Sequence, residues 1–217
     1  MKVIVCHAVL FDLDGVLVDS TPCVERHWGN WAHKHGRDAA EILRFSHGRT
    51  TIETIRLIAP ELDAAAEAAA LAAIGESDLE GVEVMPGASE LLASLPKELW
   101  AVVTSGPRLI ARKRLVHCGL PIPNVFITAD DIRRGKPAPD GYLAAAAALH
   151  CRPENCVVIE DAPSGIEAAH AAGMRVIAVA TTFNSVQLPV ADAAVNSVSA
   201  IRAQLRNGEI EILVSDI

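Results

Sequence analysis

The chain of 217 residues is long enough to bury a core, and 51% of its residues are apolar while only 4% are aromatic. This composition favours packed helices and aliphatic strands over an all-β sandwich. The formal net charge of −8 argues against a surface for nucleic acid or an anionic membrane, because either surface would need clustered Lys and Arg. From the length we expect one large domain, or a domain with a smaller insert.

The five cysteines indicate a reducing compartment. Their number is odd, none has C-x-x-C spacing, and a chain of this length does not need disulfide staples. Residues 1–10 lack the basic and apolar regions of a secretory leader, and no apolar run is long enough to span a membrane. We expect reduced thiols in a cytoplasmic, monomeric protein.

Short apolar runs alternate with helical stretches along the chain. The first run, Val3 to Phe11, predicts one strand buried on both faces, and further strands are predicted at residues 99–103, 125–128, 156–159, 175–179 and 193–195. This alternation is typical of an α/β fold with a doubly wound parallel sheet, in which ligands bind at the carboxyl ends of the strands. Residues 209–217 fit either an edge strand or a loose tail.

The residue pattern after the first strand changes from strand-like to helical. Between residues 16 and 84 there are no β-branched runs, and the Ala-rich stretch 64–73 is a strong helix former. Met85-Pro86-Gly87 then breaks the helical pattern. We expect a helical cap domain at residues 16–85 over the strand ends, and an α/β core domain built from residues 1–15 and 86–217.

Two carboxylates, Asp12 and Asp14, follow the first predicted strand. Alternation along a strand places their side chains on the same side, and Gly15 allows a sharp turn close to a ligand. Two carboxylates this close repel each other unless a cation is present, and Mg²⁺ prefers oxygen ligands and bridges to phosphate. A plain turn is the alternative for this motif alone, but three further polar motifs follow other predicted strands.

The second polar motif is Thr104, Ser105 and Gly106, after the strand at 99–103. Its hydroxyl and backbone N–H groups can bind phosphate oxygens without adding charge. Ser and Thr before Gly-Pro also form simple turns or cap the helix predicted to start near Arg108. The motif alone therefore does not decide between a phosphate site and a helix start.

The third and fourth motifs supply a cation and two more acids. Lys136 precedes two prolines, and Pro137 biases the backbone of Lys136 away from helix, so its ammonium group can be aimed at little entropic cost. Glu160 and Asp161 end the strand at 156–159. The alternatives are that Lys136 is a solvated surface residue and that Asp161 caps the following helix.

Together, the four motifs resemble those of the haloacid dehalogenase superfamily, in the same order and over nearly the whole chain: D-x-D-G-V at 12–16, T-S-G at 104–106, K-P-x-P-D at 136–140 and E-D-x-x-x-G at 160–165. The resemblance implies a Rossmann-like core, with a parallel sheet flanked by helices, and a small all-α cap inserted after the first strand. It also implies phosphoryl-transfer chemistry.

The resemblance implies a role for each of the core residues. Asp12 would be the nucleophile that becomes an aspartyl phosphate, and Asp14 would be the general acid and base. Lys136 would neutralise the charge of the nucleophile and of the transferring phosphoryl group. Thr104, with Ser105 beside it, would bind the phosphate oxygens. Mg²⁺ would be held by Asp12, the backbone carbonyl of Asp14, Asp161 and, directly or through water, Glu160.

The cap sequence resembles sugar-phosphate phosphatases of the hexitol-phosphate, 2-deoxyglucose-6-phosphate and glycerol-phosphate type, over residues 19–28 and 47–49. Gly48 permits a close turn, while His47 and Arg49 are candidates to contact substrate, because Arg49 can hydrogen-bond hydroxyl groups or phosphate. The resemblance therefore implies a Mg²⁺-dependent phosphatase acting on a small phosphorylated sugar or polyol.

The same residues bear on three alternatives to a phosphatase. A sugar phosphomutase close to beta-phosphoglucomutase is the main rival, but the cap His of such mutases aligns with Val24, and His27 is predicted to lie on the helix surface. Trp28 and Trp31 fit the cap core better than a sugar platform. Haloacid dehalogenases lack an acid at the position of Asp14, and a non-catalytic sensor of phosphorylated metabolites would not need every catalytic position filled.

Overall fold

The computed structural model describes residues 2–215 and is built around a six-stranded sheet. Neighbouring strands are parallel, and their order is β6-β5-β2-β7-β8-β9. The strands are β2 (Ala8–Phe11), β5 (Trp100–Val103), β6 (Val125–Ile127), β7 (Cys156–Glu160), β8 (Arg175–Val179) and β9 (Ala193–Val195). The expected α/β class with a parallel sheet is confirmed.

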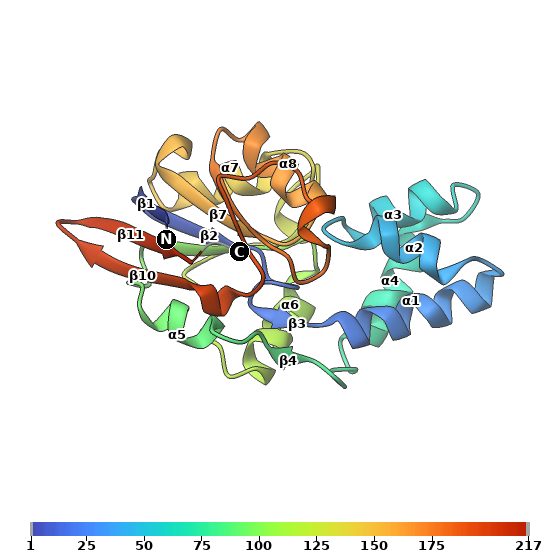
Figure 1. Cartoon of the computed structure of the whole chain (residues 1–217). Coiled ribbons are helices and arrows are strands. Elements are labelled where there is room, and N and C mark those ends of the chain that lie inside the picture. The colour runs from blue at the N-terminus through green and yellow to red at the C-terminus, as the bar shows by residue number, and fades with distance from the viewer. Residues whose placement is uncertain (1, 216–217) are drawn as a thin grey trace.

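Helices cover both faces of this sheet (Figure 1). They are α5 (Ala88–Ala93), α6 (Arg108–His117), α7 (Asp140–Ala148) and α8 (Pro163–Ala171), with short 3₁₀ turns at η1 (Ala129–Asp131), η2 (Pro153–Asn155), η3 (Ser185–Gln187) and η4 (Val198–Ala200). Alternation along β2 divides the core. Ala8 and Leu10 belong to the buried cluster that includes residues of α7 and α8, whereas Val9 and Phe11 belong to the cluster that includes residues of α5 and α6.

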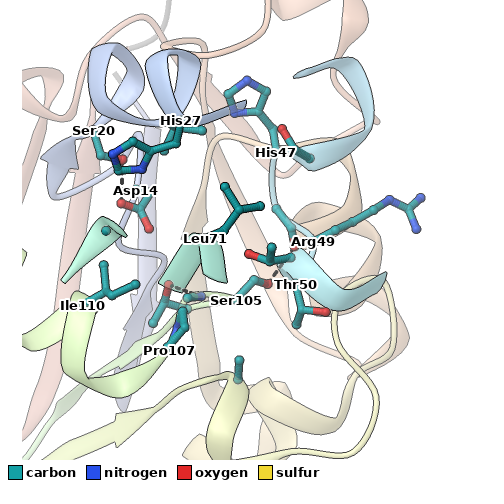
Figure 2. Close-up of a pocket in the computed structure, with 18 of the residues that line it drawn as sticks. Asp14, Ser20, His27, His47, Arg49, Thr50, Leu71, Ser105, Pro107 and Ile110 are labelled. Carbon is teal, nitrogen blue, oxygen red and sulfur yellow. Dashed lines mark hydrogen bonds between the residues drawn. The ribbon is translucent and has the colours of Figure 1, made fainter. Parts of the chain in front are cut away.

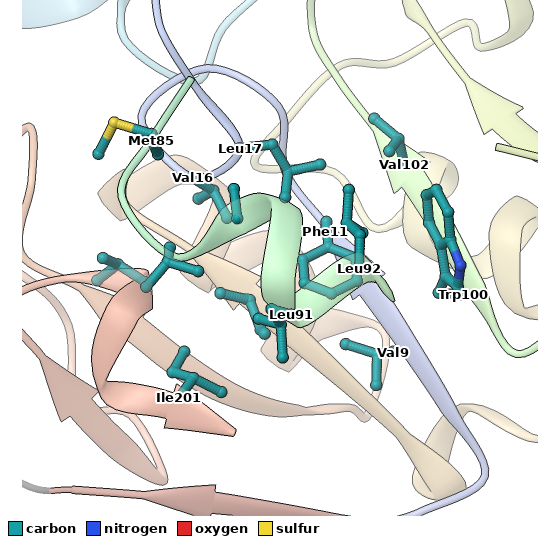
Figure 3. Close-up of a cluster of buried hydrophobic side chains, with 14 of the residues drawn as sticks. Val9, Phe11, Val16, Leu17, Met85, Leu91, Leu92, Trp100, Val102 and Ile201 are labelled. Carbon is teal, nitrogen blue, oxygen red and sulfur yellow. The ribbon is translucent and has the colours of Figure 1, made fainter. Parts of the chain in front are cut away.

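The α5 side of the core is the more aromatic layer. Phe11 and Trp100 meet edge to face at 6.1 Å between ring centroids, and Leu91 and Leu92 of α5 lie beside them (Figure 3). Ile201, from a second sheet, closes the layer. Because all these side chains are buried, the strands of the sheet and the residues at their ends have a rigid foundation.

The prediction of a single strand over Val3 to Phe11 is wrong. The run divides at His7 into β1 (Lys2–Cys6) and β2, and the two strands belong to different sheets. Val3 and Val5 are 50% and 40% exposed while Ile4 and Cys6 are buried, so β1 has one wet face. Because the solvent-exposed face of β1 also carries apolar residues, the sequence does not show the alternation of buried and exposed positions.

The C-terminal segment is neither an edge strand nor a loose tail in the part that the structure describes. β11 (Glu209–Val214) pairs antiparallel with β1 on one side and with β10 (Ile201–Arg206) on the other, so it is the central strand of a three-stranded sheet. Residues 216–217 of this prediction lie outside the described residues.

Four helices follow the first strands and form a cap beyond the carboxyl ends of the sheet (Figure 1). They are α1 (Thr21–His35), α2 (Ala39–Ser46), α3 (Thr51–Ile58) and α4 (Ala64–Gly75). Trp28 and Trp31 are 6% and 4% exposed and pack with Ile42, Ile55 and Leu71 in a separate apolar cluster. The expectation that both Trp residues form the core of the cap is confirmed.

A short ribbon connects core and cap. β3 (Val18–Asp19) pairs antiparallel with β4 (Glu83–Val84), so the chain leaves and re-enters the core side by side. Each of the five cysteines is free, as expected of reduced thiols. Within residues 2–215, no helix combines the length and the hydropathy needed to cross a bilayer.

Candidate active site

The site lies where the carboxyl ends of β5, β2 and β7 meet the cap. The parallel register places Thr104, Asp12 and Asp161 directly after these three neighbouring strands. A cavity of about 250 Å³ separates them from the cap helices (Figure 2). The predicted site residues that line it are Asp12, Asp14, His47, Arg49, Thr104, Ser105, Gly106 and Asp161.

Lys136 lies behind Asp12 rather than in the cavity wall. Its ammonium group donates to Asp12 Oδ1, to Glu160 Oε1 at 2.6 Å and to the carbonyl of Val103 at 3.3 Å. Burial would lower the pKa of Lys136, but Asp12 and Glu160 reverse this effect and hold it well above its ordinary value. Lys136 is therefore a buried, permanently charged partner of Asp12.

Glu160 is fully buried and holds Lys136 in place. Its Oε1 also accepts from the hydroxyl of Tyr142 at 3.0 Å, and its Oε2 accepts from the backbone N–H groups of Asp161 and Ala162 at 2.8 and 2.9 Å. A Cβ on Gly165 would lie 1.6 Å from Oε1, so only glycine fits there. Both carboxylate oxygens thus have protein donors, and the metal contact predicted for Glu160 stays a prediction.

Three carboxylates are buried close together at the strand ends, and they carry more negative charge than the ammonium group of Lys136 can balance. Ligand oxygens of Asp12, Glu160 and Asp161 lie within 4.8 Å of one another. Burial raises the pKa of Asp161 well above its ordinary value, and Glu160 and Asp12 add to the increase. Burial likewise raises the pKa of Asp12 to about 7, although Lys136 opposes this.

A divalent cation fits this group of oxygens. Lys136 alone leaves the carboxylates undercompensated, and Mg²⁺ takes carboxylate oxygen ligands. The backbone also comes close, because a Cβ on Gly15 would lie 2.0 Å from Asp161 Oδ2. The absence of a side chain at Gly15 therefore leaves room for the Asp161 carboxylate beside the loop that carries Asp14.

Asp14 is held by two donors on one of its oxygens. Its Oδ1 accepts from Ser20 Oγ at 2.7 Å and from Arg114 Nη1 at 2.5 Å (Figure 2 shows Asp14 and Ser20). The sequence analysis missed Arg114, which lies on α6 among other basic residues. A signal was present, because Arg114 occupies the helical face formed by Ile110, Ala111 and Leu115, all of them buried.

The loop after β5 contributes to both the cavity and the cap contact. Thr104 is 3% exposed, and its hydroxyl oxygen accepts from the backbone N–H of Gly106 at 3.0 Å. Ser105 instead donates to the carbonyl of Gly48, on the cap, at 2.8 Å. In this arrangement Ser105 is thus engaged by the cap, while the phosphate contact predicted for it stays a prediction.

The cap loop at residues 47–49 packs onto the core. Ser164 Oγ donates to the carbonyl of His47 at 3.4 Å, and the His47 ring meets Phe183 edge to face at 5.7 Å. Burial lowers the pKa of His47. Figure 2 shows Arg49 with its guanidinium group extended away from Asp14. Both residues line the cavity, and His47 is the one fixed by contacts.

The prediction that His27 lies on the helix surface is wrong. Its side chain is only 10% exposed, and its Nε2 lies 2.8 Å from Asp78 Oδ2. Asp78, on the chain segment that returns from the cap, also binds Arg26 through both carboxylate oxygens at 2.7 Å. This returning segment covers one face of α1, which the periodicity of α1 alone could not reveal. His27 and Val24 both line the cavity.

Comparisons with known proteins agree with this geometry. The model of the haloacid dehalogenase-like hydrolases matches residues 6–173. Hexitol phosphatase A of Escherichia coli is 44% identical over 95% of this chain and 99% of its own length, and glycerol-1-phosphate phosphohydrolase 2 of Saccharomyces cerevisiae is 39% identical over 82% and 76%. The crystal structure of a hydrolase from Pseudomonas syringae superposes with a TM-score of 0.80, at 27% identity over 89% of this chain and 94% of that one.

Proposed function

The chain belongs to the haloacid dehalogenase-like hydrolases, and from this we propose that it is a Mg²⁺-dependent phosphatase of small phosphorylated sugars or polyols. One observation carries the proposal. The carboxylate of Asp12 ends the central strand β2, faces the cavity, and is paired from behind with the buried ammonium group of Lys136. Relatives named for hexitol and glycerol phosphates support the substrate class.

Asp12 is the proposed nucleophile. Lys136 engages Oδ1, so Oδ2 is the oxygen that attacks phosphorus and forms the aspartyl phosphate as the bond to the leaving alkoxide breaks. Asp14 gives its proton to that alkoxide. Asp14 then accepts a proton from the water that attacks phosphorus, which releases inorganic phosphate and restores the Asp12 carboxylate. This division replaces one slow hydrolysis by two faster steps.

The charge of the phosphoryl group is met from several sides. The hydroxyl of Thr104 and the backbone N–H of Ser105, two residues that line the cavity, are the proposed donors to its oxygens, while Lys136 would offset its charge from behind Asp12. Mg²⁺ would be held by Asp12, Asp161 and the backbone carbonyl of Asp14, with Glu160 contributing directly or through water. When bound, Mg²⁺ would neutralise the charge that develops on the phosphoryl oxygens.

The cap domain, assigned to residues 16–85, would select the leaving group and exclude water. Its contribution to the cavity wall is mixed, because apolar side chains such as Val24, Trp28 and Leu71 lie among polar ones such as His27 and Arg49. Core and cap contact each other through Ser105 and the carbonyl of Gly48. A sugar or polyol chain would therefore lie between the cap helices while its phosphate faces the strand ends.

The test is phosphate release from a panel of hexitol, glycerol and hexose phosphates, with Mg²⁺ and with EDTA. We expect release from at least one polyol or sugar phosphate, and loss of release in EDTA. Binding without release would show a non-catalytic sensor. Conversion of glucose 1-phosphate into glucose 6-phosphate would show a mutase, which Val24 in the cavity wall argues against.

A further inference from the structure

Arg114, on α6, contacts the proposed acid and base, Asp14, and both residues line the cavity. We propose that Arg114 is a positioning residue that fixes the orientation of the Asp14 carboxylate toward the leaving group. The inference rests on the proposed phosphatase function and assigns a role to a residue outside the four motifs. Its Nη1 lies 2.5 Å from Asp14 Oδ1, although the two residues are 100 positions apart in the sequence.

The two oxygens of Asp14 are in different surroundings. Oδ1 accepts from both Arg114 and Ser20, whereas Oδ2 has no protein donor among residues 2–215. The Asp14 side chain is 31% exposed, and the residue lines the cavity. With Oδ1 occupied, Oδ2 is the oxygen available to carry a proton to the leaving group and to take one from water.

Arg114 itself has little freedom to move. Its side chain is 9% exposed, and it lies on a helical face whose other members, Ile110, Ala111 and Leu115, pack into the protein. Its Nε is buried without a hydrogen-bond partner among the described residues. Burying a guanidinium group with incomplete hydrogen bonding is costly, so Arg114 keeps the orientation in which it donates to Asp14. The same bond fixes the orientation of the Asp14 carboxylate.

The second donor to Asp14 comes from the start of the cap. Ser20 directly precedes α1, while Arg114 belongs to the core helix α6. Next to Arg114, Lys113 donates to the carbonyl of Glu76 on the segment that returns from the cap, at 2.6 Å. Asp14 is thus clamped between one donor from the rigid core and one from the cap connection, and Arg114 is the fixed half of that clamp.

The experiment compares kcat/KM for two substrates that differ in their need for an acid. An alkoxide must be protonated as it leaves from glycerol phosphate, whereas 4-nitrophenolate leaves from 4-nitrophenyl phosphate as a stable anion. We expect Arg114→Met to lower kcat/KM for glycerol phosphate by about 10²-fold, and for 4-nitrophenyl phosphate by less than about threefold. Arg112→Met removes the same charge from an exposed position of the same helix, and both values should be unchanged.

A double-mutant cycle with Asp14→Asn isolates the pair. In the Asp14→Asn background, Arg114→Met should change kcat/KM for glycerol phosphate by less than about twofold, because the group that it positions has already lost its function. Arg114→Lys keeps the charge with a shorter reach, and should show a smaller loss with the same preference for the alkyl substrate. This variant also serves if Arg114→Met does not fold.

Two results would overturn the inference. Equal losses on both substrates with a raised KM would show that Arg114 binds substrate, and additive effects in the double mutant would show that it acts independently of Asp14. The proposed function fails separately: if Asp14→Asn alone shows no preference between the two substrates, then Asp14 is not the acid. A selective Asp14→Asn with a non-selective Arg114→Met overturns only the role of Arg114.

Discussion

The core and the cap hold the site by different means. In the core, side chains hold side chains: Lys136 bridges Asp12 and Glu160, and Arg114 binds Asp14. Where the cap loop at residues 47–49 meets the core, core hydroxyls donate to backbone carbonyls, as Ser105 does to Gly48. The identity of the core residues is therefore constrained by chemistry, whereas the position of the cap loop depends on backbone shape and on space.

The difference predicts where substitutions act. Core substitutions should change the chemical step, since they remove charges next to phosphorus. Cap substitutions should change how well the cavity closes over substrate, and so should appear mainly in KM or kcat/KM. Variants from the two regions, each with a control of the same chemical type, test this division.

Asp12→Asn should have the largest effect. An amide cannot form the acyl phosphate, so kcat should fall by at least about 10³-fold while the fold is kept. Phosphate release and thermal unfolding check the two halves of the prediction. Asp38→Asn, at an exposed cap position, is the matched control and should retain full activity. Ordinary turnover by Asp12→Asn would remove the nucleophile from the mechanism.

Lys136→Met should reduce both activity and stability. The substitution leaves Asp12 and Glu160 buried without their cation, which should lower kcat by about 10²-fold and the free energy of unfolding by about 3–5 kcal/mol. Urea unfolding and phosphate release measure the two effects. Lys97→Met changes the same residue type at an exposed position and should alter neither. An active, fully stable Lys136→Met would show that the acidic group does not depend on this ammonium.

The same contrast explains what the sequence could predict. Polar residues after apolar runs marked the ends of β2, β5 and β7 correctly, because a buried parallel strand is apolar throughout and its end is not. The separate sheet formed by β1 and β11 was not predicted, because strands that pair across nearly the whole length of the chain leave no local pattern in the sequence. Arg114 was overlooked because other basic residues surround it on the same helix. The carbonyl of Gly48 could not be predicted as an acceptor, because every residue type has a backbone carbonyl.

Gly48→Ala tests closure of the cap against simple backbone strain. Gly48 has φ of 76°, and an added Cβ would lie 2.3 Å from Ser164 Oγ and 2.9 Å from the Cβ of Ala162. We expect kcat/KM to fall about tenfold because the loop cannot approach the core. Gly36, with φ of 62° and open space around it, supplies the control.

Both glycine variants should lose about 1 kcal/mol of unfolding free energy, since alanine disfavours a positive φ. Only Gly48→Ala should lose activity. If Gly36→Ala lost as much kcat/KM, strain in the cap rather than contact with the core would control the enzyme. Steady-state kinetics and urea unfolding on the two proteins are sufficient to separate these outcomes.

Ser105→Ala should have the smallest effect, and it decides whether Ser105 serves the cap or the phosphate. Loss of the hydrogen bond to the carbonyl of Gly48 should weaken closure by about 1 kcal/mol, which raises KM about fivefold and leaves kcat nearly unchanged. Ser94→Ala removes a comparable bond, from Ser94 Oγ to the carbonyl of Leu91 at 2.7 Å, on a core helix end, and should leave KM unchanged. If kcat of Ser105→Ala falls instead, its hydroxyl contacts the transferring phosphoryl group and the division between core chemistry and cap closure does not hold at this residue.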